Sequence, residues 1–165
     1  MSSPASVARH PIHPMLVVFP IGLWTFSLVC DIIFVFGGRE PMWNSVALYT
    51  AIGGIVGAAL AAIPGLIDYF SIDDKEVRAI GTRHMIVNLG ALLIFIVASI
   101  CRARSISPAI PFVLSIAGIV LISIGGWLGG ELVYVKGMAV EPVEELAPEQ
   151  ERRNSRSDRR LRRVG

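Results

Sequence analysis

Four long apolar stretches, at residues 14–36, 45–70, 84–101 and 110–130, constrain this chain more than any other feature. A helix rises about 1.5 Å per residue, so roughly 20 apolar residues cross a hydrocarbon core of about 30 Å. Lipid offers no hydrogen-bond partners, and a helix is the structure that satisfies its own backbone there. The stretches do not alternate between apolar and polar residues, as strands of a barrel do. The sequence therefore predicts an all-α integral membrane protein, a four-helix transmembrane bundle.

The charges are segregated from these stretches. The chain is 53% hydrophobic and 17% charged, where soluble domains carry about 25% charged residues. We expect one membrane domain over residues 8–140 and a charged tail over residues 141–165. The tail is acidic first and arginine-rich later, with few apolar residues, so it is predicted to be disordered. Because no aromatic residues interleave its arginines, the lipid bilayer is the expected partner and nucleic acid is not.

The loop cations predict the orientation, because cytoplasmic loops carry an excess of Lys and Arg. The N-terminal side has the larger set, namely Arg9, Lys75, Arg78, Arg83, Lys136 and the arginines of the tail. The opposite side has Arg39, Arg102 and Arg104. Both termini are therefore predicted to be cytoplasmic.

Small residues form stripes along two of the predicted helices. The second stretch carries Gly53, Gly57, Ala61 and Gly65 at intervals of four. The fourth offers Gly118, Gly126 and Gly130 as a matching surface, with Gly125 and Gly129 alongside. Such stripes let neighbouring backbones approach closely, either within one chain or between copies in a homo-oligomer.

Polar residues of the first stretch share one face of the predicted helix. An α-helix turns by about 100° per residue. Along the first helix, this rotation places five residues close to one line on its surface: His13, Pro20, Trp24, Ser27 and Asp31. Polar groups are costly in lipid, so this face should point into the bundle. Pro20 cannot donate a backbone hydrogen bond, which predicts a kink in the helix.

Strict alternation of the four crossings brings a set of polar residues to one rim. The set comprises His10, His13, Asp68, His84 and Glu131, all near the N-terminal side. Asp31 is expected near the opposite surface, because eighteen residues of helix separate it from His13. Asn88 lies one turn from His84 and shares its face. The rim is therefore the candidate site.

Two motifs carry a family resemblance. His10-Pro11-Ile12-His13-Pro14 opens the first stretch, and Gly-Gly-Glu-Leu-Val-Tyr, residues 129–134, ends the fourth. Together with Asp31, Asp68, His84 and Asn88, they resemble the bacterial membrane family named domain of unknown function 2231, over roughly residues 8–140. The resemblance implies four helices and a bacterial inner (plasma) membrane. Some relatives are joined to Rieske-type domains, which favours redox chemistry and a membrane redox partner.

The sharpest hypothesis is that the rim binds a metal-containing group. One version is haem b, with one axial imidazole from His13 or His10 and another from His84. A second version is a transition-metal ion held by His10, His13 and His84 with Asp68 or Glu131. Cys30 and Cys101 both lie toward the other side, where they either form a disulfide or serve as small buried hydrophobes.

Two other roles stay open. In a scaffold without a cofactor, His13 would cap the first helix, His84 would bond Asp68, and Glu131 would pair with Arg83 or Lys136. In a small proton or ion transport subunit, Asp31 and the rim would be two ends of a path. An enzyme is less expected, because the chain lacks a serine nucleophile elbow, a P-loop and an HExxH motif.

Overall fold

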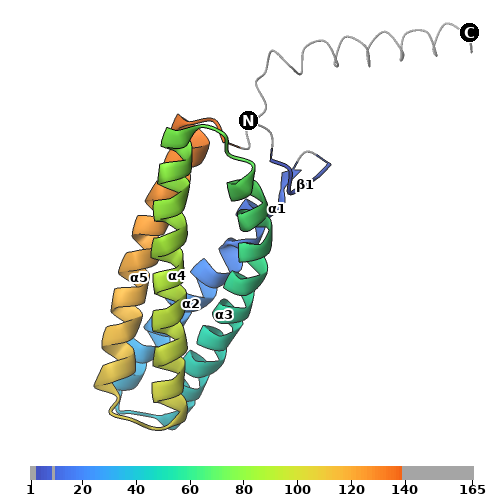
Figure 1. The fold of residues 1–165 in the computed structure, drawn as a ribbon. Coiled ribbons are helices and arrows are strands. Elements are labelled where there is room, and N and C mark those ends of the chain that lie inside the picture. The colour runs from blue at the N-terminus through green and yellow to red at the C-terminus, as the bar shows by residue number, and fades with distance from the viewer. Residues whose placement is uncertain (1–2, 9, 139–165) are drawn as a thin grey trace, which may run out of the picture.

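The computed structural model describes residues 3–8 and 10–138, and within them the chain forms a bundle of four long helical segments (Figure 1). The first segment comprises α1 (Ile12–Leu16) and α2 (Val18–Phe36). The others are α3 (Pro41–Phe70), α4 (Lys75–Ala103), and α5 (Ala109–Gly130), which continues into the π-helical turn η1 (Glu131–Val135). All four segments are long and apolar enough to cross a membrane. The all-α, four-helix membrane fold predicted from the sequence is confirmed.

A short hairpin precedes the bundle. Its strands are β1 (Ser6–Val7) and β2 (His10–Pro11), which pair antiparallel. The hairpin lies beside the end of α3 that carries Asp68 (Figure 1). The predicted tail, residues 141–165, lies outside the described residues.

The third membrane segment begins nine residues before the predicted boundary, at Lys75 rather than residue 84. Asp74 caps this helix, and its carboxylate accepts hydrogen bonds from the backbone N–H groups of Glu76 and Val77. The first turns of α4 are charged, so they carry no apolar signal. His84 consequently lies about 13 Å along the helix from its start, instead of at its first turn.

The first membrane segment is interrupted at Val17, between α1 and α2. Pro20 has no backbone N–H, so the helical hydrogen bond to the carbonyl of Leu16 cannot form. The interruption lies three residues before Pro20, where the sequence predicted a kink, and directly after the short helix that carries His13.

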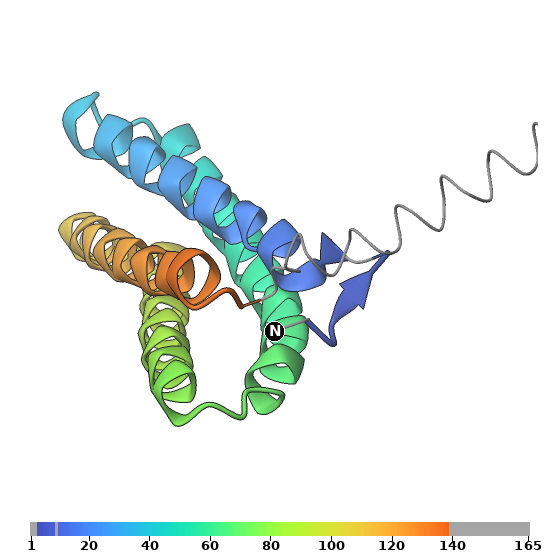
Figure 2. The ribbon, with the colours of Figure 1, turned by 90° about the horizontal axis from the view of Figure 1, so that it is seen from above.

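The bundle is built from two hairpins of sequential helices, α2 with α3 and α4 with α5 (Figure 2). The stripe of α3 packs on α2: a Cβ built at Gly57 would lie 3.2 Å from the Pro20 ring. The stripe of α5 packs on α4, so the two stripes do not match one another as the sequence suggested.

The face of α5 that makes contact also differs from the predicted one. Gly118 lies against Phe95, Gly125 against Asn88 and Gly129 against His84. Nothing lies within 4 Å of a Cβ built at Gly126. The face of α5 that contacts α4 therefore includes Gly125 and Gly129, which the sequence analysis placed beside the predicted stripe.

The hairpins meet through an aromatic pair near the middle of the bundle. The rings of Trp24 and Phe95 stack with centroids 4.3 Å apart and planes 6° apart. Trp24 also donates its indole N–H to the carbonyl of Ala51 at 3.2 Å. This pair separates the polar groups at one end of the bundle from those at the other.

Candidate functional site: a histidine pair and a buried ion pair

Two of the predicted site residues, His13 and His84, meet in the interior near the N-terminal end of the bundle. Their ring centroids are 6.1 Å apart and the ring planes are nearly perpendicular, at 82°. His13 comes from α1 and His84 from the third turn of α4. Both side chains are half-buried. The close approach of these two segments, 71 positions apart in sequence, depends on how the two hairpins dock.

Each imidazole is oriented by a backbone carbonyl of another helix. His13 Nδ1 bonds the carbonyl of Ala61 in α3 at 2.7 Å, and His84 Nδ1 bonds the carbonyl of Gly125 in α5 at 2.9 Å. A carbonyl oxygen only accepts, so Nδ1 is the protonated nitrogen in both rings. In a neutral imidazole, Nε2 then carries the lone pair. Metal-ligating histidines are usually held in this way.

Glycines make room for both rings. A Cβ at Gly65 would lie 2.8 Å from His13 Nδ1, and one at Gly129 would lie 3.2 Å from Cε1 of His84. Both distances are shorter than ordinary van der Waals contact, so a side chain at either position would press on an imidazole. The stripes therefore serve the histidine pair as well as helix packing.

Asn88 fixes His84 from one turn further along α4. Its amide nitrogen donates to the carbonyl of His84 at 2.7 Å and lies 3.4 Å from both ring nitrogens. The amide packs on Gly125, whose carbonyl accepts from His84. Asn88, which the sequence placed on the same face, therefore belongs to the surroundings of this ring.

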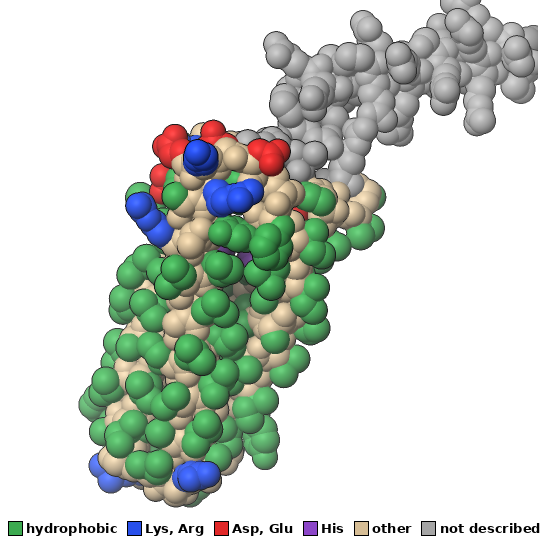
Figure 3. Space-filling view, in the orientation of Figure 1, with side chains coloured by type: hydrophobic (Ala, Val, Ile, Leu, Met, Phe, Trp, Pro, Cys, Tyr) green, Lys and Arg blue, Asp and Glu red, His purple; other side chains and the backbone are tan. Residues whose placement is uncertain are grey.

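The pair lies below the charged rim rather than in it. Figure 3 shows acidic and basic side chains over the end of the bundle and histidine side chains in a hollow beneath them. The rim includes an exposed ion pair in which Lys136 Nζ donates to Glu76 Oε1 at 2.7 Å. This contact raises the pKa of Lys136 above its ordinary value. The backbone N–H groups of Val77 and Glu76 lower the pKa of Asp74.

The other predicted site residues have other surroundings than the histidine pair. His10 is exposed on the hairpin and its Nδ1 bonds the carbonyl of Ala8 at 2.8 Å. Asp68 is buried and accepts from Ser3 Oγ at 2.7 Å and from the backbone N–H of Ala5 at 3.2 Å. Glu131 begins η1. Among the residues that the structure describes, no three His, Cys, Asp or Glu side chains form a group that could hold a metal ion.

The contacts suggested for a scaffold role are also different. His84 bonds Gly125 rather than Asp68, and Lys136 pairs with Glu76 rather than Glu131. His13 does not cap α1, because its side chain reaches across to α3.

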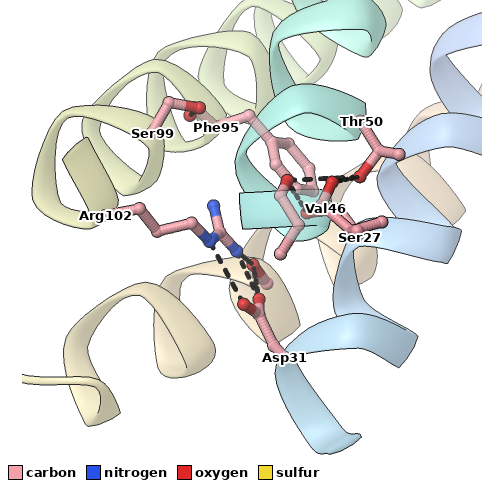
Figure 4. Close-up of polar contacts among 9 residues, drawn as sticks. Ser27, Asp31, Val46, Thr50, Phe95, Ser99 and Arg102 are labelled. Carbon is pink, nitrogen blue, oxygen red and sulfur yellow. Dashed lines mark hydrogen bonds and ion pairs between the residues drawn. The ribbon is translucent and has the colours of Figure 1, made fainter. Parts of the chain in front are cut away.

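A second polar cluster lies at the opposite end of the bundle, where Asp31 of α2, Arg102 of α4 and Ser115 of α5 converge (Figure 4). Arg102 Nε donates to Asp31 Oδ1 at 3.1 Å, and Nη2 donates to Oδ2 of the same carboxylate. Ser115 Oγ lies 2.7 Å from both Asp31 Oδ2 and Arg102 Nη2. The side chain of Arg102 is fully buried and that of Asp31 is 4% exposed.

Sequence reasoning missed Arg102 and Ser115. Arg102 directly follows the apolar stretch and was assigned to a loop, whereas α4 continues to Ala103. Asp31, a lone acid within an apolar stretch, was the available signal, because a buried carboxylate requires a partner cation. Cys30 and Cys101 lie next to the pair in sequence; both are free, with Cys30 buried and Cys101 half-buried.

The comparisons with known proteins agree with the fold. A family model described as a predicted membrane protein, DUF2231, matches residues 9–142, which include all four membrane segments. No curated protein and no solved structure matches the chain.

Proposed function

Since the chain belongs to the DUF2231 family of predicted membrane proteins, we propose its function from the site itself: it is a membrane haem protein that carries electrons. In this proposal, His13 and His84 would hold one haem b.

A single observation carries the proposal. Two imidazoles from different hairpins lie 6.1 Å apart, each with Nδ1 committed to a backbone carbonyl. Metal–imidazole bonds are about 2.0–2.1 Å long, so two rings that share one iron have centres roughly 6 Å apart. The observed separation of the ring centroids is close to that distance, and Gly65 and Gly129 leave room for the two rings on their Nδ1 side.

The number of ligands favours haem over a bare metal ion. Haem iron takes only axial ligands from the protein, because the porphyrin supplies the others. A transition-metal ion in a protein usually takes three or four protein ligands. The pair His13 and His84 meets the first requirement, whereas His10 and Asp68 have hydrogen-bond partners in the N-terminal segment instead.

Each neighbour of the pair has a role in this proposal. The carbonyls of Ala61 and Gly125 hold the two rings and raise the basicity of Nε2 in each. Asn88 restrains the ring of His84. When bound, the haem would supply one-electron redox chemistry, and its burial between helices would tune the potential.

We further propose that the protein lies in a bacterial inner membrane with both termini cytoplasmic. Arg102 is bonded to Asp31 inside the bundle, so it does not count as a loop cation. Arg39 and Arg104 then remain on that side, against Lys75, Arg78 and Arg83 in the first turns of α4. A membrane redox partner, or a second copy of the chain, would exchange electrons at the cytoplasmic end.

A scaffold without a cofactor is the second candidate, and the same hydrogen bonds favour it. His13 joins α1 to α3 and His84 joins α4 to α5, as interhelical fasteners would. Proton transport has less support, because Asp31 is held by Arg102 and Ser115 rather than free to exchange protons along a path.

The absorption spectrum of the full chain, purified in detergent with haem available during expression, tests the proposal. We expect a Soret band in the wild type that is lost in His13→Ala and in His84→Ala. His10→Ala is the matched control, because that ring is exposed and bonded within the N-terminal β1–β2 hairpin. This variant should retain the band. A colourless wild type with stoichiometric metal would favour a metal ion. A wild type with neither haem nor metal would contradict the proposal and favour the scaffold.

A further inference from the structure

The guanidinium of Arg102 is satisfied on two of its three nitrogens. Nε and Nη2 donate to Asp31, and Nη2 also donates to Ser115. Nη1 is buried and has no hydrogen-bond partner among the residues that the structure describes. The side chain is fully buried, so bulk water does not reach this nitrogen.

An unpaired buried donor is costly. Leaving a polar group without a partner costs about 1–3 kcal/mol, and more when the group is charged. Most buried polar groups in native proteins therefore have a protein or water partner. Inside a membrane there is no alternative solvent, which makes an acceptor for Nη1 more necessary than in a soluble protein.

Charge limits what the acceptor can be. The carboxylate of Asp31 already neutralises the guanidinium, so the buried pair has no net charge. An added anion would leave an uncompensated negative charge in the bundle, and a cation would be repelled by the donor face of Arg102. The partner of Nη1 is therefore neutral and presents a lone pair.

The buried side chains drawn around Arg102 in Figure 4 favour a small partner that can also donate hydrogen bonds. Figure 4 shows Nη1 pointing away from Asp31, into the bundle interior. Ser27 Oγ donates to the carbonyl of Ala47 and Ser99 Oγ donates to that of Phe95. Both hydroxyl oxygens can still accept a hydrogen bond, because each hydroxyl acts only as a donor in these contacts. Both serines are buried, as is Phe95.

We propose that Arg102 Nη1 binds one internal water molecule at the junction of α2, α4 and α5. Water is neutral, can accept from Nη1 and has hydrogens of its own to donate, which meets the requirements of charge and lone pair given above. The water completes the polar network around Asp31 without changing its charge. A fixed guanidinium beside it also repels protons and metal cations, so the site is not a step in an ion path.

The test is a structure of the full chain in lipid at a resolution that orders internal water. We expect one solvent peak about 2.7–3.2 Å from Arg102 Nη1. In Arg102→Lys the ammonium keeps the ion pair with Asp31 but has no group in the position of Nη1. The solvent peak should therefore be lost. Ser123→Ala is the matched control, because that hydroxyl is exposed and bonds within its own helix, and it should retain the peak.

The wild-type map decides the proposal whether or not the lysine variant folds. Absence of a peak at Nη1, or its occupation by a lipid, detergent or ion, would overturn it. A peak that persists unchanged in a folded Arg102→Lys protein would also overturn it, because the water would then be held by other groups.

Discussion

The two ends of the bundle place polar groups in an apolar environment in different ways. At the histidine end, two imidazoles bond backbone carbonyls through Nδ1, and Nε2 of His84 lies 3.4 Å from the amide nitrogen of Asn88. At the opposite end, Asp31 and Arg102 bond one another and Ser115, so the carboxylate is fully engaged. The first arrangement relies on backbone acceptors from neighbouring helices. The second relies on two opposite side-chain charges, and it leaves Arg102 Nη1 without a partner among the described residues.

This difference predicts different effects of substitutions at the two ends. Neutral imidazoles can be buried at modest cost when one nitrogen is bonded, whereas each buried charge depends on its partner. We therefore expect substitutions at the ion pair to act mainly on folding. Substitutions at the histidine pair should act mainly on ligand binding, with smaller effects on stability.

The largest effect is expected for Arg102→Met. It removes the cation and leaves the carboxylate of Asp31 buried without its partner, which typically costs about 3–5 kcal/mol. Unfolding of the purified protein in mixed detergent micelles would measure this loss.

Arg104→Met is the control for this substitution, because Arg104 is exposed just beyond the end of α4. The double variant Asp31→Leu with Arg102→Met should be more stable than the single variant, since no charge is left unpaired. If Arg102→Met and Arg104→Met lost equal stability, the ion pair would not be the stabilising element at this end.

A smaller effect is expected for Gly65→Ala at the histidine end. The new methyl group would lie 2.8 Å from His13 Nδ1, so the ring must shift and its bond to Ala61 must weaken. Overpacking of this kind costs about 1–3 kcal/mol. Nitrogen NMR of the His13 ring would report the loss of the Nδ1 hydrogen bond directly.

Gly126→Ala provides the matched comparison, because nothing lies within 4 Å of a Cβ at that position. It should change stability by no more than about 0.5 kcal/mol. An unperturbed His13 ring in Gly65→Ala would show that the glycine does not position the imidazole.

The smallest effect is expected at the rim above the histidines. Asp74 accepts two backbone N–H groups at the start of α4, and these bonds lower the pKa of its carboxyl. A lowered folded-state pKa gives stability that is present above the unfolded value of about 3.9 and is lost as the pH falls through the folded value.

A carboxyl-carbon NMR titration of Asp74 should therefore show a midpoint below about 3.9. In Asp74→Ala the contribution of this group to the pH dependence of unfolding should disappear. A midpoint at or above the ordinary value would mean that the cap does not form in solution.

The polar face of the first membrane segment, α1 with α2, shows how much helical periodicity in the sequence can predict. His13, Trp24 and Ser27 were predicted to share one face, and all three donate to carbonyls of α3. The helical repeat alone places side chains on a face, because it depends only on the rotation per residue. The identity of the acceptors was not predictable, since they are backbone groups that carry no sequence signal.

The candidate rim was predicted only in part. His13 and His84 meet, whereas His10 lies on the exposed hairpin and Asp68 accepts from the N-terminal segment. Alternation of the crossings sets approximate depth, but it does not set the rotation of each helix or the path of the chain before it. The early start of α4 also moved His84 from the rim into the interior.

The sequence by itself determined that the chain crosses a membrane four times with helices, because bilayer thickness and backbone hydrogen bonding leave little alternative to four apolar stretches of this length. Tertiary structure alone decided that His13 faces His84 and that Arg102 reaches Asp31. Those partners depend on the rotation and axial offset of packed helices. Both are set by contacts such as Gly65 with His13 and Gly129 with His84, which form only when the hairpins close.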